Sequence, residues 1–230
     1  MKFSLVLDVG RSPEELSRFL KGLEKQDHSE LELLVVDRGE NNSLTHCLDD
    51  YRERLVIYHL RTEGELPAAR NLGVSMATGD VIAFPTAECW YPPGLLAQVR
   101  NCLVDKPYLD GVLGSCVMKG RMLRGGGRRT GMINKYNLRG VDCTSFTMFL
   151  RRGLLERVGR FDEYPGLPGA RSGGEDRDFL LKCVQARARL LHEPGFVVHH
   201  SGPLASVIAL NRPKGRRISI IRQRFVSRHR

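Results

Sequence analysis

The stretch PAARNLGVSMATGDVIAF (residues 67–84) places a helical pattern directly before a short apolar run. Pro67 suits the first turn of a helix, and Leu72 and Met76 are four residues apart, as on one helix face. Gly79 ends the helix, and residues 81–84 then have the pattern of a buried strand. A helix that leads into a buried strand is the repeating unit of a parallel sheet.

The flanking sequence repeats this unit on both sides. Before it, a capping-box pattern at residues 12–15 (SPEE) predicts the start of a helix. Alternating strands and helices at this spacing predict an α/β fold with a mostly parallel, doubly wound sheet. In the first half we expect strands at residues 3–7, 33–36 and 55–60, and helices at 43–51 and 93–104.

The second half is less regular, and its middle is a basic, glycine-rich loop at residues 120–131 (GRMLRGGGRRTG). Residues 175–186 have the apolar spacing of a helix, and Gly173-Gly174 before it leaves room at its N-terminus. The other elements that we expect are strands at 111–117, 145–150 and 196–199, and a short helix at 154–158.

Composition excludes several classes of protein. The chain has 230 residues, of which 41% are hydrophobic and 27% charged, as in a soluble globular domain. No run of 18 apolar residues predicts a transmembrane helix, and the N-terminal apolar run is too short for a secretory signal. The six cysteines form no C-x-x-C pair, which favours reduced thiols in the cytoplasm over a zinc site. Neither a P-loop nor a G-x-S-x-G nucleophile motif occurs.

The net charge of +10 is concentrated in two segments. Residues 111–141 hold seven Lys or Arg and residues 212–230 hold eight, and neither segment contains an acidic residue. The remaining chain has more acidic than basic residues, so a uniformly basic nucleic-acid binder is disfavoured. A loop or tail that meets phosphate or an anionic membrane surface fits better. Residues 218, 221 and 225 give the tail an amphipathic helical spacing, although a frayed, solvated tail explains the same residues.

Acidic residues follow three of the predicted strands. Asp8 follows the first, Asp37 the second, and Thr86-Ala-Glu88 the strand at residues 81–84. Ligands of open α/β sheets bind beyond the carboxyl ends of the strands, so these side chains could share one site. The competing interpretation is that acidic residues simply favour loops.

Several blocks, in their order along the chain, resemble the family 2 glycosyltransferases. They are LVVD with Gly39, PAARNLG, ATGD, VIAF, WYPPGLL and GEDRDFLL, and the resemblance covers about residues 2–200. It implies the GT-A fold in a bacterial enzyme of polysaccharide or glycolipid synthesis. The domain would span residues 1–205, with a nucleotide-sugar half at 1–110, an acceptor half at 111–205 and a basic tail at 206–230.

The resemblance also implies roles for individual residues. Asp37 matches the acid that meets the nucleotide base, and Asp8 lies where the first strand meets the nucleoside, although the family usually has Thr there. Arg70 and Asn71 match a pair near the ribose and diphosphate. Asp176, preceded by Glu175, matches the catalytic base of inverting members.

One departure from the family concerns the metal site. The usual Asp-x-Asp reads Thr86-Ala87-Glu88 here, so one carboxylate is replaced by a hydroxyl. Glu88 with His199 or His200 and diphosphate oxygens would hold Mn²⁺ or Mg²⁺ more weakly than two carboxylates do. The alternative is that arginines of the basic loop (Arg124, Arg128 and Arg129) neutralise the diphosphate directly.

The function implied is an inverting glycosyltransferase of the hexosyltransferase type. The donor would be a nucleotide sugar, UDP-linked by preference, and the acceptor a hydroxyl of a glycan or a lipid-linked sugar. We expect a cytoplasmic protein, peripheral on the inner face of the cell membrane, with no nucleic-acid partner. Two rivals remain: a catalytically impaired homologue that only binds nucleotide sugars, and a basic module that binds membrane or nucleic acid.

Overall fold

A computed structural model describes most of the chain. The described residues are 1–9, 13–27, 30–39, 43–118, 120–122, 129–141, 144–163 and 175–202. Among them, no helix has the length and apolar character that a membrane span needs. The capping box at Ser12 and the basic tail at residues 206–230 lie outside the described residues.

The described residues form a ten-stranded sheet, and its first half is parallel as predicted. The order along this half is β3-β2-β1-β4, so β3 is the outer strand and β1 is central. Because these strands run in the same direction, their carboxyl ends meet at one edge of the sheet. The strands are β1 (Phe3–Val9), β2 (Leu31–Asp37), β3 (Val56–Arg61) and β4 (Val81–Ala83).

The second half continues the same sheet with mixed directions. Strand β9 (Met148–Arg151) pairs antiparallel with both β4 and β6 (Gly111–Met118), and so joins the two halves. Strand β10 (Leu190–His200) runs parallel to β6 and carries β5 (Cys89–Trp90) antiparallel at its carboxyl end. Two short strands, β7 (Arg121–Met122) and β8 (Gly131–Met132), pair with β6 and β10.

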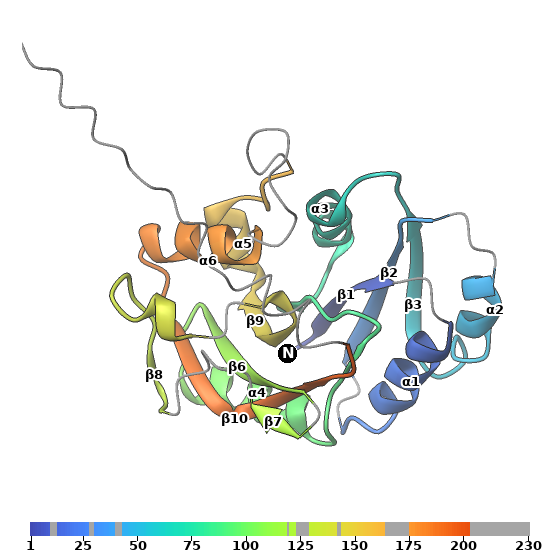
Figure 1. Cartoon of the computed structure of the whole chain (residues 1–230), viewed down its shortest axis with the longest axis horizontal. Helices are drawn as coiled ribbons and strands as arrows, with labels where there is room; N and C mark the ends of the chain where they lie inside the picture. Colours follow the sequence, from blue (N-terminus) through green and yellow to red (C-terminus); the bar gives the residue numbers. More distant parts are fainter. Residues whose placement is uncertain are drawn as a thin grey trace, which may run out of the picture.

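Helices cover both faces of the sheet: α1, α2 and α4 pack on one face, and α3, α5 and α6 pack on the other, at the top of Figure 1. A hydrophobic core lies on each face of the sheet. Successive side chains of a strand point to opposite faces, so β1 contributes to both cores: Leu5 and Leu7 pack on the α1 side and Val6 on the α3 side. The helices are α1 (Pro13–Leu23), α2 (Ser43–Asp49), α3 (Leu66–Met76), α4 (Leu95–Asp105), α5 (Arg152–Val158) and α6 (Glu175–Gln185).

Two predicted strands differ from the structure. The last strand begins at Leu190, six residues before the predicted start, because it continues past Pro194 and Gly195 with a register shift between His192 and Val197. The strand predicted at residues 145–150 begins with a 3₁₀ turn (Ser145–Thr147), where the Thr147 N–H donates to the Thr144 carbonyl at 3.1 Å. Strand pairing starts only at Met148.

Candidate functional site

The carboxyl ends of β1 and β4 are joined by backbone contacts. Asp8 and Thr86 form a parallel bridge, and the Ala87 N–H donates to the Asp8 carbonyl at 3.2 Å. The turn that carries Thr86 and Glu88 is thereby fixed beside the end of the central strand. Two of the three acidic strand ends expected from the sequence are therefore neighbours in the fold.

The Asp8 carboxylate accepts two hydrogen bonds from Arg38, a residue that the sequence analysis did not single out. Arg38 donates from Nε to one carboxylate oxygen at 2.7 Å and from Nη2 to the other at 3.2 Å. Burial would lower the pKa of Arg38, but the hydrogen bond and charge of Asp8 raise it above its usual value. The sequence signal was a cation directly after Asp37.

Asp37 ends β2 and is buried, with 2% of its surface exposed. One carboxylate oxygen accepts the Gly39 N–H at 2.8 Å, and the other faces His59 Nε2 on β3 at 3.5 Å. Asp37 and Asp8 thus have separate partners, although both stand at the same edge of the sheet.

Glu88 and His200 meet at the carboxyl end of β10. Glu88 Oε2 lies 3.0 Å from His200 Nε2, and the Gly202 N–H donates to His200 Nδ1 at 3.0 Å. Because Nδ1 accepts a hydrogen bond, Nε2 carries the ring hydrogen and donates it to Glu88. Burial lowers the pKa of His200, against the opposing charge of Glu15, so the imidazole is neutral at neutral pH.

The space beside this pair depends on Gly202. A Cβ on this residue would lie 2.6 Å from His200 Cε1 and 2.9 Å from Glu88 Oε2. A carboxylate and a neutral imidazole are suitable donors for a divalent cation. For His200 Nε2 to bind one, its hydrogen must move to Nδ1 and the Gly202 contact must open. Within the described residues, no group of three or more His, Cys, Asp or Glu is placed to hold a metal ion.

Thr86, at the position of the missing carboxylate, pairs with a cysteine. Its Oγ1 lies 3.3 Å from Cys89 Sγ, and burial raises the pKa of Cys89 to about 12, despite hydrogen bonds from Thr86 that lower it. Cys89 is therefore a thiol, which is a poor substitute for a carboxylate ligand.

His199 is turned away from this pair. It is paired in register with Trp90 on β5, and the two rings are stacked at 4.9 Å and 6°. Since neighbouring strand residues point to opposite faces, His199 and His200 have separate surroundings. The structure brings His200, and not His199, to Glu88. Burial lowers the pKa of His199 as well.

Arg70 on α3 and Asp176 at the start of α6 form a buried ion pair, each less than 5% exposed. Asp176 Oδ2 accepts the Ser145 N–H at 2.8 Å, and Arg70 Nη2 donates to Ser145 Oγ at 2.6 Å. Both Asp176 oxygens therefore have donors. Ser145, a third partner that the sequence analysis missed, lies in the 3₁₀ turn before β9.

Asn71 follows Arg70 on α3, and Glu175 precedes Asp176 on α6. The Asn71 amide donates to the Phe161 carbonyl and to Glu163, and its oxygen accepts the Phe161 N–H, each at 2.9 Å. These contacts fix the segment that follows α5, and both the NH₂ group and the oxygen of the Asn71 amide have partners. Glu175 is buried, with 5% of its surface exposed.

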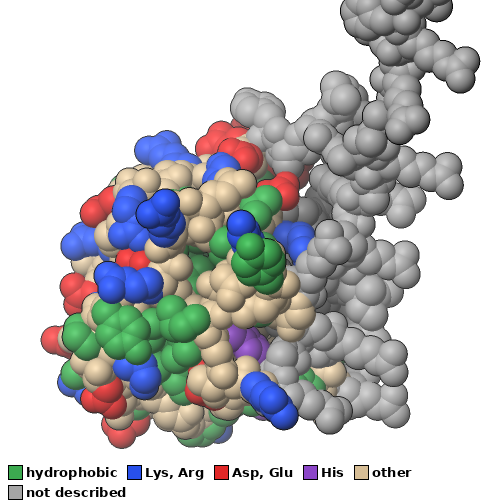
Figure 2. Space-filling view, turned by 90° about the vertical axis from the view of Figure 1, so that its left-hand side faces the viewer, with side chains coloured by type: hydrophobic (Ala, Val, Ile, Leu, Met, Phe, Trp, Pro, Cys, Tyr) green, Lys and Arg blue, Asp and Glu red, His purple; other side chains and the backbone are tan. Residues whose placement is uncertain are grey.

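The basic segment is described only in part. Arg124 and Arg128 lie outside the described residues, and Arg129 is exposed next to β8. Strand β8 pairs at His192, whereas Glu88 meets His200, eight residues further along β10 and roughly 25 Å away. Figure 2 views the side of β8 and α6, where hydrophobic side chains are exposed among Lys and Arg. The structure does not bring Arg129 to the Glu88–His200 pair.

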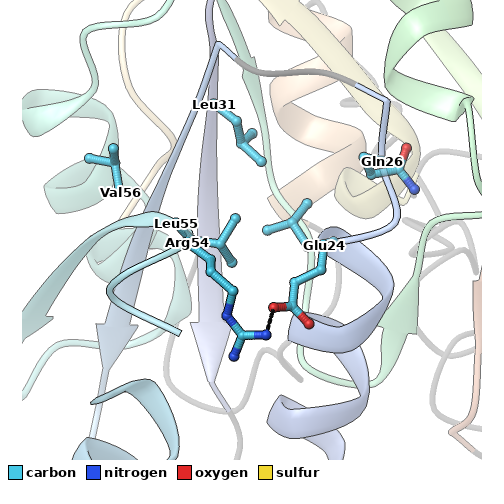
Figure 3. Close-up of a pocket in the computed structure, with 7 residues that line it drawn as sticks. Glu24, Gln26, Leu31, Arg54, Leu55 and Val56 are labelled. Carbon is cyan, nitrogen blue, oxygen red and sulfur yellow. Dashed lines mark ion pairs between the residues drawn. The ribbon is translucent and has the colours of Figure 1, made fainter. Parts of the chain in front are cut away.

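A surface pocket of about 350 Å³ lies at the opposite edge of the sheet, where β2 and β3 begin. Figure 3 shows Glu24 and Arg54 pointing toward one another there, as an ion pair with a 2.5 Å separation. The Gln26 amide donates to the Tyr91 and Pro92 carbonyls, at 3.0 and 2.8 Å. None of the residues expected to act on a substrate lines this pocket.

The sequence model of the family described as Glycosyl transferase family 2 matches residues 4–159, more than half of the chain. The chain belongs to this family. The match includes Asp8, Asp37, Arg70 and Glu88 and ends before Asp176. The glycosyl transferase family assigned from the sequence is thereby confirmed.

Known proteins agree with this assignment. EpsH of Bacillus subtilis, named as a glycosyltransferase, is 26% identical over 106 residues, which are 45% of this chain and 30% of EpsH. The structure resembles S. aureus TarS in complex with UDP, with a TM-score of 0.74 and 22% identity over 92% of this chain and 64% of that one. It also resembles the mannosyltransferase PcManGT of Pyrobaculum calidifontis in complex with GDP-Man and Mn²⁺, with a TM-score of 0.67 and 20% identity over 90% of this chain and 59% of the other.

These likenesses confirm the predicted GT-A fold. The glycosyl transferase domain spans about a third of the length of the curated relatives that it matches.

Proposed function

We propose that this glycosyl transferase domain moves a sugar from a nucleotide donor, UDP-linked by preference, to a hydroxyl of a polysaccharide or glycolipid. The proposal is carried by one observation. Glu88 after β4 and His200 at the end of β10 converge at 3.0 Å beside a glycine that leaves room, at the edge where α/β sheets bind ligands. TarS and PcManGT, which share the fold, are described in complex with UDP and with GDP-Man.

In the proposed reaction, the acceptor oxygen attacks the anomeric carbon as the bond to the diphosphate breaks. Attack from the face opposite the leaving group inverts the configuration. Asp176 takes the proton of the acceptor hydroxyl, and such general-base help is worth about 10²–10⁴-fold in rate. The products are the glycoside, the nucleoside diphosphate and a protonated carboxyl group.

Asp176 accepts one donor on each oxygen, Arg70 on Oδ1 and the Ser145 N–H on Oδ2, and loss of the Arg70 contact would free a further lone pair for the acceptor hydroxyl. We assign this release to a movement of Arg70, whose guanidinium would turn from Asp176 to the developing charge on the diphosphate. The buried Glu175 adds a second acidic residue beside the base. This movement of Arg70 from Asp176 to the diphosphate would couple departure of the nucleotide to deprotonation of the acceptor.

A divalent cation fits the site in part. Glu88 and, after its ring hydrogen moves to Nδ1, His200 would hold Mn²⁺ or Mg²⁺. When bound, such an ion offsets the negative charge that builds on the leaving diphosphate. A single carboxylate at this position predicts weaker metal binding than the family's usual pair of carboxylates.

A donor panel tests the proposal. The protein is mixed with UDP-, GDP- and dTDP-sugars, with and without Mn²⁺, and both the melting temperature and release of nucleotide are followed. At 100 times its dissociation constant, a true donor stabilises the fold by about 2.7 kcal/mol. If no nucleotide shifts the melting temperature and none is released, even by transfer to water, the proposal is wrong.

Two observations favour a second candidate, a nucleotide-sugar binder without transfer. Thr86 replaces a carboxylate, and the candidate base is held in a buried ion pair. This alternative predicts a donor that raises the melting temperature and is recovered intact after prolonged incubation with a broad panel of glycan and lipid-linked acceptors.

A further inference from the structure

Two buried polar atoms face one another at the carboxyl end of β2. Asp37 Oδ2 and His59 Nε2 are 3.5 Å apart, and their side chains are 3% and 11% exposed. Neither atom has a hydrogen-bond partner in the described structure. Leaving a buried polar group unsatisfied costs about 1–3 kcal/mol, so two such atoms side by side call for an explanation.

The pairing of β2 with β3 dictates that they meet. Val35 is in register with His59, and Asp37 with Arg61. His59 therefore stands diagonally below Asp37 on the same face of the sheet, at a spacing that a long side chain spans. Because β3 is the outer strand, His59 lies at the edge of the sheet beside the carboxylate.

The other neighbours of Asp37 leave Oδ2 to His59. The Gly39 N–H donates to Oδ1, and the Thr62 N–H donates to the Asp37 main-chain carbonyl at 3.0 Å. Arg38, the adjacent cation, donates from two of its nitrogens to Asp8 instead. Asp37 thus has a fixed backbone and one fixed oxygen, and the imidazole is the described side chain that faces the second oxygen.

We propose that His59 is a positioning residue for Asp37 and, through it, sets the affinity for the nucleobase of the donor. The inference rests on the proposed function and on the role that the family resemblance implies for Asp37, which is contact with the nucleotide base. When the imidazole donates Nε2–H to Oδ2, it holds the carboxylate in one orientation and leaves a lone pair for a donor on the ligand. The imide N–H of uracil is such a donor, and a charge-assisted bond to it is stronger than a neutral one.

Titration calorimetry with UDP and a double-mutant cycle test this inference. His59→Phe keeps a ring and removes the donor, and we expect it to weaken UDP binding about tenfold. His59→Gln, which restores an N–H at similar reach, should recover most of the loss. In an Asp37→Asn background, His59→Phe should have no further effect, because the carboxylate that it orients is gone. In donor turnover, KM should rise while kcat stays unchanged.

Controls separate positioning from folding. Tyr58→Phe alters the neighbouring residue of β3, whose side chain is 45% exposed, and should leave UDP binding unchanged. If His59→Phe does not fold, His59→Asn, with an amide too short to reach Asp37, replaces it. The inference is overturned if His59 variants lower the melting temperature but not UDP affinity, or if the losses in the cycle simply add. Failure of the wild-type protein to bind any nucleotide would overturn the proposed function, and this inference with it.

Discussion

Arg70 and Asp176, 106 residues apart in sequence, form an ion pair buried between α3 and α6. The carboxylate at the position of the proposed base is therefore held by the cation expected near the diphosphate. We interpret the pair as the resting arrangement of the site, which nucleotide binding opens.

Asp176→Asn should retain UDP binding and lose transfer. The amide oxygen can still accept the Ser145 N–H, but the amide cannot take a proton from the acceptor, so kcat should fall by about 10²–10⁴-fold. Calorimetry and donor turnover measure the two effects separately. Asp178→Asn, which alters an exposed carboxylate two residues along the same helix, is the matched control and should change neither. Loss of UDP binding in Asp176→Asn would assign Asp176 to structure instead.

Glu88→Gln should abolish the response of nucleotide binding to Mn²⁺. The amide keeps the shape and the hydrogen-bond acceptor for His200 Nε2 but removes the charge that attracts the ion. UDP affinity is measured with and without Mn²⁺ in wild type and variant. A Mn²⁺ response of the same size in both proteins would exclude Glu88 from the metal site.

Gly202→Ala should impair the Glu88–His200 site by filling the space beside these two side chains. The added Cβ would lie within 3.0 Å of both His200 and Glu88, so the two side chains must separate. We expect weaker nucleotide binding in the presence of Mn²⁺ with a nearly unchanged melting temperature. Gly131→Ala, where an added Cβ meets nothing within 4 Å, is the control. Equal binding by the two variants would show that the space beside Glu88 is not used.

Glu32 should make the fold sensitive to acid. Its carboxylate is fully buried and accepts hydrogen bonds from Lys2, Ser4 and Thr78. Burial alone would raise its pKa, but these bonds together lower it from 4.5 to about 2. The stabilisation is thus complete above pH 4.5 and is lost as the pH falls toward 2, by up to about 3 kcal/mol. Urea denaturation of wild type and Glu32→Gln measures it. An identical loss of stability in both proteins across this range would rule out Glu32 as the source.

Local patterns predicted the repeating elements of the fold and the edge at which the site lies. Helix and strand periods located α3 and β4 within about two residues; Asp37 ends β2, and Asp8 lies one residue before the end of β1. The family blocks implied that Arg70 and Asp176 belong to one site, and the structure brings the two side chains into contact. These features are readable because they depend on the spacing of neighbouring residues.

Apart from Arg70 and Asp176, which the family resemblance had placed together, the contacts between distant segments were not predictable from the sequence. The Arg38–Asp8 pair and the approach of His59 to Asp37 depend on the register of β1, β2 and β3. The separation of His199 from His200 depends on the pairing of β10 with β5. Antiparallel strands such as β9 leave no pattern that sets their neighbours, because any apolar strand can pair with either partner.

A crystal structure with UDP and Mn²⁺ tests the central proposal most directly. We predict that the uracil lies against Asp37 and that the diphosphate and the ion lie beside Glu88 and His200, with Arg70 released from Asp176. Nucleotide bound instead in the pocket between Glu24 and Arg54 at the opposite edge of the sheet, with Glu88 and His200 untouched, would contradict it.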